Sequence, residues 1–365
     1  MRKCPICQSG KHELVWSTVV ACADCGLVYD HEPAAMDYNS LEAYSLAEPE
    51  PKRTQRTVHM LTPYIGKNAL EIGCGRGELL AELHKRTAAS GLDLSHANVE
   101  ACRTKGLRVV EGTILDVGPM GEFDLIVLAH VLEHLTDPIC ALNKMRDWLS
   151  PKGYVYVEVP DATRHLDHLT VPFQEFSPEH INHFSPLLLV RILQMAGLEA
   201  VTIGTRSIPL PNGDLYPAMG IIAKRGAGHS GVRDEMLPWL MRAYAEKSEN
   251  KLQAITDHVL KQLNGSKAIA WGAGVLANHL LPRLEGKVTS IVDRDKSKQG
   301  RVIAGIRVTA PPPNGNDPIL ITSIANAPSI HRDLRAAGIK NAIVDCDYLK
   351  SQAKTNAAMA GGMSR

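Results

Sequence analysis

The sequence lacks an excess of charge of either sign. Its 365 residues include 40 Lys and Arg against 39 Asp and Glu, which gives a formal net charge of +1. Proteins that recruit nucleic acid or an anionic membrane through their overall field carry a clear surplus of positive charge. We therefore expect no nucleic-acid partner and no membrane partner, and we expect the ligands to be small molecules.

Long hydrophobic runs are also missing. No stretch approaches the roughly 20 apolar residues that a membrane-spanning helix needs. The chain begins Met-Arg-Lys-Cys, without the apolar core of a secretory signal. Both absences predict a cytoplasmic location.

Cysteine is scarce, with eight residues in the chain, so a disulfide framework is not expected. Cys4 and Cys7 form one CxxC pair, and Cys22 and Cys25 form a second pair after an interval of fourteen residues. This spacing predicts four thiolates around one tetrahedral zinc, with rubredoxin-like iron as the alternative. Four protein ligands leave no open coordination position, so the predicted site is structural. The other cysteines are predicted to be packing residues: Cys74, Cys102, Cys140 and Cys346.

A glycine-rich turn stands at residues 69–77, Ala-Leu-Glu-Ile-Gly-Cys-Gly-Arg-Gly. The apolar start predicts a buried strand, and the alternate glycines let the backbone turn tightly and approach a ligand before a helix over 78–85. Asp93 ends a second apolar run, where its carboxylate can accept both hydroxyls of a ribose. The carboxylate of Glu71, at the end of the first strand, can attract the positively charged methionine part of a ligand.

These features predict a site for S-adenosylmethionine. The residues predicted to bind it are Glu71, Gly73, Cys74, Gly75, Gly77, Asp93, Leu94, Thr113, Ala129 and His130.

Glycine turns alone are weak evidence, because dinucleotide-binding folds use similar ones. Residues 123–135 resemble the fourth strand of class I methyltransferases and the turn after it, and residues 149–160 resemble their fifth strand. The order of the motifs is also that of the family, over roughly residues 60–225. The resemblance implies a Rossmann-like α/β fold and a methyltransferase activity.

Candidate catalytic residues lie between residues 161 and 215, ahead of the predicted last strand at 218–223. His180 and His183 stand in a loop expected beyond the carboxyl ends of the strands, where open α/β sheets bind ligands. Imidazole has an unperturbed pKa of ~6.5, so either ring can serve as a base at neutral pH. Glu179 can orient such a base or bind substrate, and His134 is a further candidate. The alternative is that these histidines only satisfy loop carbonyls.

The helix predicted after this loop has clear boundaries. Ser185 is a good N-cap with Pro186 at the first helical position, and Gly197 follows the last turn of an amphipathic stretch at 186–196.

The whole arrangement resembles the zinc-containing sugar C-methyltransferases, which act on nucleotide-linked keto-deoxysugars. The matching residues are Cys4, Cys7, Cys22, Cys25, the following Gly26-Leu27-Val28, and Glu179, His180, Phe184 and Ser185. The resemblance implies that His180 is the base that removes a proton next to the sugar ketone. Ser177 stands where the family usually has tyrosine, and the interval between the cysteine pairs is shorter than in the family. O-methylation, which needs only a base and alignment, is the alternative reaction.

A second glycine turn follows a strand predicted to begin at Lys267. Gly272, Gly274 and Ala277 fit the GxGxxA variant of the dinucleotide motif, and Asp293 stands about twenty residues further on. A second Rossmann-like domain is therefore predicted, with NAD or another nucleotide as a possible ligand. The family resemblance instead assigns such a domain to shaping the acceptor site.

The predicted fold class is α/β, with a methyltransferase domain between an N-terminal zinc module and a smaller C-terminal Rossmann-like domain. We expect a monomer or a homodimer. The predicted segments are a zinc-binding module at 1–35, a linker and entry helix at 36–60, a methyltransferase domain at 61–225 with an acceptor-binding insertion at 161–215, a helical connector at 226–264, a Rossmann-like domain at 265–350 and a disordered tail at 351–365.

Overall fold

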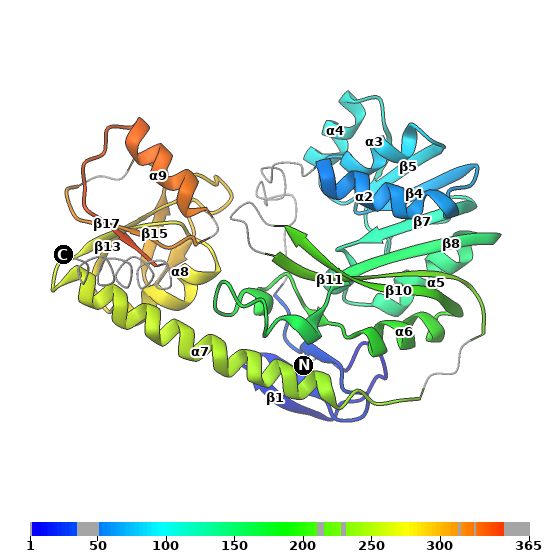
Figure 1. Cartoon of the computed structure of the whole chain (residues 1–365), viewed down its shortest axis with the longest axis horizontal. Helices are drawn as coiled ribbons and strands as arrows, with labels where there is room; N and C mark the ends of the chain where they lie inside the picture. The colour runs from blue at the N-terminus through cyan, green and yellow to red at the C-terminus, as the bar shows by residue number, and fades with distance from the viewer. Residues whose placement is uncertain are drawn as a thin grey trace, which may run out of the picture. The chain divides into compact units, whose positions relative to one another are not determined.

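The computed structural model describes residues 2–34, 51–209, 215–227, 231–312, 315–324 and 326–346 (Figure 1). The chain divides into two compact units. The first unit holds residues 1–168, 175–208 and 215–243, and the second holds residues 169–174, 209–214 and 244–365. Most of the predicted linker at 36–60 and the whole predicted tail at 351–365 lie outside the described residues.

The first unit is built on a seven-stranded sheet with the order β10-β11-β8-β7-β4-β5-β6. The neighbours from β6 to β8 are all parallel, whereas β11 is antiparallel to β8. The central strands are continuously apolar because both faces of a parallel sheet are covered. The strands are β4 (Asn68–Ile72), β5 (Ala88–Asp93), β6 (Arg108–Glu111), β7 (Phe123–Ala129), β8 (Leu149–Pro160), β10 (Leu198–Pro209) and β11 (Leu215–Arg225).

The helices described beside this sheet are α2 (Pro51–Leu61), α3 (Glu78–His84), α4 (His96–Thr104), α5 (Pro138–Trp148) and α6 (Pro186–Met195). Their starts follow from local chemistry. The Oγ of Ser185 accepts a hydrogen bond from the amide of Leu188 at 3.1 Å, as expected of an N-cap before a proline. In the same way the Oδ1 of Asp137 accepts from the amide of Cys140 at 2.9 Å at the start of α5. Short 3-10 turns complete the unit: η1 (Thr62–Tyr64), η2 (Leu132–His134), η3 (Ala162–Arg164) and η4 (Gln174–Phe176).

The N-terminal strands form a separate small sheet with the order β1-β2-β3-β9. Its strands are β1 (His12–Trp16), β2 (Val19–Cys22), β3 (Val28–Asp30) and β9 (Asn182–His183). The last strand comes from the predicted catalytic loop, so Val28 pairs with His183 and Tyr29 with Asn182. The N-terminal module is therefore hydrogen-bonded to the loop that carries His180.

The second unit is built on a six-stranded sheet with the order β14-β15-β13-β12-β16-β17. All neighbours are parallel except the β14–β15 hairpin. Trp271, Ile319, Ile321, Ile330 and Leu334 form a buried cluster between this sheet and α9. The elements are β12 (Ala268–Trp271), α8 (Val275–Leu280), η5 (Leu281–Leu284), β13 (Val288–Val292), β14 (Val302–Ile303), β15 (Ile306–Thr309), β16 (Ile319–Ile321), α9 (Ala327–Ala336) and β17 (Ile343–Asp345).

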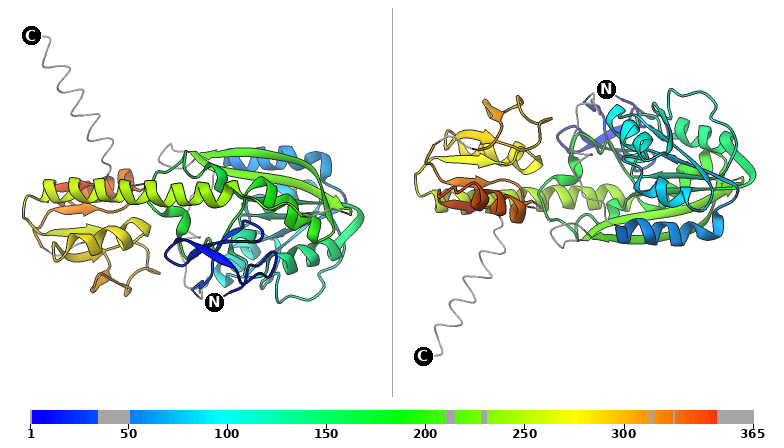
Figure 2. Two further views of the ribbon diagram at one scale, coloured as in Figure 1. Left: turned by 90° about the horizontal axis from the view of Figure 1, so that it is seen from below. Right: turned by 90° about the horizontal axis from the view of Figure 1, so that it is seen from above.

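The long helix α7 (Met236–Leu263) runs from the first unit into the second and is drawn as one continuous helix in Figure 2. Among the described residues, no helix has the length and apolar character needed to cross a lipid bilayer.

The predicted fold class is confirmed, since both Rossmann-like sheets and the four-cysteine module are present. The sequence did not predict β10. Residues 198–209 lie inside the range interpreted as an acceptor-binding insertion, yet they form the edge strand of the first sheet. Most positions of β10 are exposed, so its sequence lacks the apolar alternation that indicates a half-buried strand.

Candidate functional site

The first glycine turn joins β4 to α3 and is held by the carboxylate of Asp93. The Oδ2 of Asp93 accepts from the amide of Gly75 at 2.7 Å, and its Oδ1 accepts from the amide of Ser95 at 2.9 Å and from Nδ2 of Asn98 at 3.2 Å. A carboxylate offers about four lone-pair sites, so these three donors leave one for a ligand hydroxyl. Asp93 therefore orders the turn as well as facing the ligand.

Gly73, Gly75 and Gly77 have φ angles of 69°, 54° and 82°, in the left-handed region that favours glycine. Their surroundings differ. A Cβ at Gly73 would lie 2.3 Å from Cγ2 of Val131, and one at Gly77 would lie 2.7 Å from Cδ1 of Leu107. A Cβ at Gly75 would meet nothing within 4 Å, so this backbone faces open space.

A cavity of about 310 Å³ opens at the carboxyl ends of β4, β5 and β7. Apolar side chains such as Ile72, Leu92 and Ile114 line it, together with a few polar groups. This mixture is typical of a small-molecule site, and both the volume and the open backbone of Gly75 fit an adenosine-containing ligand. The predicted site residues that line the cavity are Gly73, Gly75, Asp93, Leu94, Thr113, His130 and His134.

Four residues predicted to bind the cofactor are not among those that line the cavity: Glu71, Cys74, Gly77 and Ala129. Glu71 is buried, and its Oε2 has no hydrogen-bond partner among the described residues. Burial raises the pKa of this carboxyl well above its usual value, and the nearby acidic groups of Cys102, Glu78 and Asp93 add to the rise. Gly77 and Cys74 pack beneath the turn, where Cβ atoms at Gly77 and Gly91 would clash with the sulfurs of Cys102 and Cys74.

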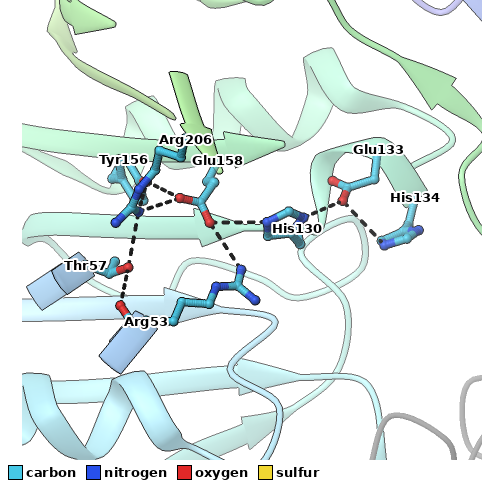
Figure 3. Close-up of polar contacts among 8 residues, drawn as sticks. All are labelled: Arg53, Thr57, His130, Glu133, His134, Tyr156, Glu158 and Arg206. Carbon is cyan, nitrogen blue, oxygen red and sulfur yellow. Dashed lines mark hydrogen bonds and ion pairs between the residues drawn. The ribbon is translucent and has the colours of Figure 1, made fainter. Parts of the chain in front are cut away.

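His130 follows β7 and lies between two buried carboxylates (Figure 3). Its Nδ1 is 3.3 Å from Oε1 of Glu133, and its Nε2 is 3.2 Å from Oε1 of Glu158. Burial opposes protonation, but the two carboxylates outweigh it and raise the pKa of His130 to about 9. His130 also has a φ of 55°, unusual for a residue with a side chain, and its amide donates to the carbonyl of Glu158 at 2.8 Å. The cavity wall thus carries an imidazolium at neutral pH.

Glu158 connects this imidazolium to two arginines (Figure 3). Its Oε2 accepts from Nη1 of Arg206 at 2.6 Å and from the hydroxyl of Tyr156 at 2.5 Å, and its Oε1 accepts from Nη2 of Arg53 at 3.2 Å. Burial alone would raise the pKa of Glu158, but His130, Arg53 and Tyr156 hold it far below the usual range. Arg206 also donates to Oγ1 of Thr57 at 3.2 Å, so the cluster joins α2 and β10 to the centre of the sheet.

His134 stands at the end of the cavity, on η2. Its Nδ1 binds the carbonyl oxygen of Glu179 at 2.6 Å, and its Nε2 is 3.8 Å from Oε1 of Glu133. A carbonyl can only accept, so Nδ1 carries the proton in the neutral ring. Burial lowers the pKa of His134. Burial would raise the pKa of Glu133, but His134, His130 and His180 lower it, so this carboxylate is ionised.

His180 comes within reach of His134, with ring centroids 5.3 Å apart. Its Nδ1 lies 3.5 Å from Oε2 of Glu175, a residue buried on η4. Burial opposes protonation of His180, but the contact with Glu175 raises its pKa above the usual value. Three of the predicted catalytic residues, His134, Glu179 and His180, are therefore brought together, and His134 lines the cavity.

His183 has different surroundings. Its side chain is 3% exposed, lies edge-on to the ring of Phe176 at 5.5 Å, and is absent from the cavity wall. Burial lowers the pKa of His183 to about 3, so the ring is neutral and enclosed. Its place in β9 indicates packing against the N-terminal module, and we do not retain it as a candidate base.

The four cysteines of the N-terminal module gather into one cluster, with their sulfurs all within 4.8 Å of one another. The sulfurs of Cys4 and Cys25 are 3.5 Å apart, and those of Cys7 and Cys22 are 3.4 Å apart. Four sulfurs at ~2.3 Å from a tetrahedral zinc would lie about 3.8 Å from one another. The cluster therefore fits a zinc ion after a small expansion.

The module is fixed to the loop that carries His180 by side chains as well as by β9. Arg2 donates to Oδ1 of Asn182 and to the carbonyl of Thr136, each at 2.9 Å. Asn182 in turn donates to the carbonyl of Leu135 at 2.8 Å, one residue after His134. The four-cysteine module thus supports the segments that carry His134 and His180.

The polar residues that surround the candidate bases were not predicted from the sequence. Glu158 sits near the end of β8 in a mostly apolar run, and Arg206 sits on an edge strand without a regular pattern. Glu175 lies only five residues before His180 but stands in a segment with no regular period. A carboxylate in an otherwise apolar run, such as Glu158 in β8, is the one signal that could have indicated a buried polar network.

Comparisons with known proteins match the part of the chain that carries this cavity. Residues 46–203 match the family model described as a methyltransferase domain. A trans-aconitate 2-methyltransferase of Rhizobium leguminosarum bv. trifolii is 28% identical over 151 residues, which cover 40% of this chain and 54% of that protein. A ubiquinone biosynthesis O-methyltransferase of Thiobacillus denitrificans is 28% identical over 162 residues, or 40% of this chain and 69% of that protein. This chain thus spans about half the length of the first of these curated relatives.

Among solved structures, a SAM-dependent methyltransferase from Archaeoglobus fulgidus aligns with a TM-score of 0.41 and 20% identity, over 50% of this chain and 97% of that one. Residues 46–203 of the chain form a class I S-adenosylmethionine-dependent methyltransferase domain. The four-cysteine module and the second Rossmann-like sheet are further parts of the same chain.

Proposed function

We propose that the chain methylates a small-molecule acceptor, and that its reaction is C-methylation of a nucleotide-linked keto sugar with His180 as the base. The observation that carries this proposal is the position of His134 and His180. His134 lines the cavity, and the ring centroid of His180 lies 5.3 Å from that of His134. His180 also contacts the buried carboxylate of Glu175. Imidazoles at the end of a donor cavity are suited to taking a proton from an acceptor.

Gly73, Gly75 and Asp93 would hold S-adenosylmethionine, with Leu94, Thr113 and His130 on the cavity wall. When bound, the cofactor would supply a methyl group to a nucleophile, with the carbon–sulfur bond broken and its electron pair kept by the sulfur of the S-adenosylhomocysteine that leaves. The chain's own residues must make that nucleophile. For a keto sugar, His180 takes the proton from the carbon next to the ketone, and the electron pair left on that carbon is shared with the carbonyl as an enolate.

His134 and Glu133 then face the imidazolium that His180 becomes. The carboxylate of Glu133 is buried and ionised, and its Oε2 has no hydrogen-bond partner among the described residues. A negative charge at this position stabilises the proton on His180 through the low-dielectric interior. Glu179 contributes its carbonyl oxygen, which fixes the tautomer of His134.

O-methylation is the second candidate reaction. The relatives include a ubiquinone biosynthesis O-methyltransferase, and the same base could take a proton from a hydroxyl. Which reaction occurs depends on whether the acceptor places a carbon or an oxygen opposite His180.

The four-cysteine cluster is proposed to hold a structural zinc. A module of about thirty residues buries too little apolar surface to fold alone, so metal binding would supply folding free energy. Through β9 and Arg2 the zinc would also hold the loop that carries His180.

For the second unit, a nucleotide-binding role is the candidate. Its glycine turn repeats the contacts of the first: the amide of Ala273 donates to Oδ2 of Asp293 at 2.7 Å. The ligand would be a nucleotide or dinucleotide, as the GxGxxA pattern indicates.

The base assignment is tested with His180→Ala and the surface control His84→Ala. The acceptor is first sought by thermal stabilisation with a panel of nucleoside diphosphates in the presence of S-adenosylhomocysteine, because a ligand that binds only the native state raises its stability. Turnover is then measured as the mass of one added methylene on the matching keto sugar. His180→Ala should keep its affinity for S-adenosylhomocysteine and lose about 100-fold to 10,000-fold in kcat. Turnover equal to that of His84→Ala would reject His180 as the base.

A further inference from the structure

Glu175 is a buried acid that the sequence did not single out. It lies on η4, is 6% exposed, and directs one oxygen, Oε2, toward three side chains. The hydroxyl of Tyr216 donates to this oxygen at 2.9 Å, Nδ1 of His180 lies 3.5 Å away and Nε2 of His165 lies 3.6 Å away. A buried carboxylate is costly unless donors surround it, so this arrangement keeps a charge beside His180.

We propose that Glu175 is the positioning residue of His180, accepting a hydrogen bond from Nδ1–H so that the lone pair of Nε2 faces the acceptor. The inference rests on the proposed function, because it requires His180 to be the base. It adds a residue that acts through His180 and does not itself touch substrate.

The contact with Glu175 determines which ring nitrogen of neutral His180 carries the hydrogen. A neutral imidazole has one N–H and one lone pair, and an ionised carboxylate can only accept. Glu175 therefore selects the tautomer in which Nδ1 carries the hydrogen and Nε2 is basic, which is the role an acid plays behind a histidine in hydrolytic triads. The same carboxylate stabilises the imidazolium after proton transfer.

The charges agree with this geometry. Burial would raise the pKa of Glu175, but His165, His180 and Tyr216 lower it to about 2, so the carboxylate is ionised throughout the neutral range. Other titratable groups near His180 are His134, Glu133, Glu179, His165 and His183. Burial lowers the pKa of His134, so this neighbouring ring is neutral.

The two other partners of Glu175, Tyr216 and His165, are connected to strands of the first sheet. Tyr216 belongs to β11, which pairs with β8 from Ala218 opposite Pro160 onward. His165 follows η3, directly after β8. Because one partner of Glu175 belongs to β11 and the other follows β8, both strands help to hold its Oε2 in place.

The experiment titrates His180 directly by NMR in protein labelled at the histidine Cε1 carbon. The signal of His180 is assigned by its loss in His180→Asn. The variants are Glu175→Gln, which removes the charge but keeps an oxygen that can accept from Nδ1, and the exposed control Glu100→Gln. In Glu175→Gln the pKa of His180 should fall by about one pH unit, since a neighbouring opposite charge is lost. The control should titrate as wild type.

Turnover gives the second readout. Because the base acts in its neutral form, the rising limb of the kcat profile should move to lower pH in Glu175→Gln. The plateau should fall about 10-fold to 100-fold because the base is weaker, with KM and the affinity for S-adenosylhomocysteine little changed. Glu175→Ala, which also removes the acceptor oxygen, should lose more.

An unchanged titration of His180 in folded Glu175→Gln would overturn the proposal. If that variant does not fold, Tyr216→Phe replaces it: removing one donor leaves the carboxylate a stronger acceptor, so the pKa of His180 should not fall, and a fall would contradict the proposal. The titration needs no acceptor. A shifted titration in a protein without methyl transfer would therefore leave the pairing intact and reject only the proposed function.

Discussion

In both glycine turns of this chain an aspartate accepts a hydrogen bond from a backbone amide of the turn, but the backbone angles and the surrounding residues differ. In the first, Oδ2 of Asp93 accepts from the amide of Gly75 at 2.7 Å, and in the second, Oδ2 of Asp293 accepts from the amide of Ala273 at 2.7 Å. The Oδ1 atoms accept from Ser95 and from Asp295, each at 2.9 Å. In each sheet, the aspartate at the end of the second strand therefore holds the backbone of the turn in place.

The two sites differ in the residue that follows the neighbouring strand of each sheet. After β7 the first sheet presents His130, held between two carboxylates on the wall of the cavity. After β16 the second sheet presents Thr322, which is 1% exposed and donates to the carbonyls of Trp271 and Gly272. Asp293 also has a cation nearby, with Nζ of Lys298 at 3.7 Å. A similar contact between an aspartate and a glycine turn therefore does not imply that the two sites bind the same ligand.

The largest effect is expected from making the first site resemble the second, with His130→Thr. The pKa of His130 is about 9 in the folded chain and about 6.5 when unfolded. Its contribution to stability is therefore fully present below pH 6.5 and is lost as the pH rises through 9. His130→Thr should be destabilised by up to about 3 kcal/mol at pH 6.

The measurement is urea unfolding of wild type and His130→Thr at several pH values. The difference between them should shrink as the pH approaches 9.5. A difference that is constant with pH would show that His130 acts by packing alone, and the electrostatic contrast between the two turns would fail.

A smaller effect is expected at the second glycine of each turn. Gly75 has a φ of 54°, whereas Gly274 has a φ of −94°, which any residue adopts. A Cβ meets nothing within 4 Å at either position, so backbone conformation alone decides the outcome. Gly75→Ala should cost about 1–2 kcal/mol, whereas Gly274→Ala should be neutral or stabilise by up to about 1 kcal/mol.

Thermal unfolding of the two alanine variants in parallel checks this. Equal destabilisation by both would mean that the turns share the same strained conformation, contrary to the angles observed.

The sequence predicted the parts of the site that depend on local pattern. Apolar runs predicted β4 and β7, the serine–proline pair predicted the start of α6, and cysteine spacing predicted the four-sulfur cluster. Each signal is carried by residues a few positions apart, so local stereochemistry is enough to interpret it.

The remaining features depend on pairings across the chain. Val28 pairs with His183, and Arg206 binds Glu158, over separations that no local pattern encodes. The predicted role of His183 illustrates the limit: its place in the loop suggested catalysis, but pairing with the N-terminal module buries it. Glu175 was missed for the same reason, because its partners are far from one another in the sequence: His165 follows η3 and Tyr216 lies in β11.

The most direct test of the account is a calorimetric titration of the full chain with S-adenosylhomocysteine, using wild type, Asp93→Ala and Asp293→Ala. The account predicts one site in wild type, an affinity at least about 100-fold weaker in Asp93→Ala because the contact that holds the turn is lost, and wild-type affinity in Asp293→Ala. Loss of binding in Asp293→Ala, with binding retained in Asp93→Ala, would place the cofactor in the second unit and contradict the account.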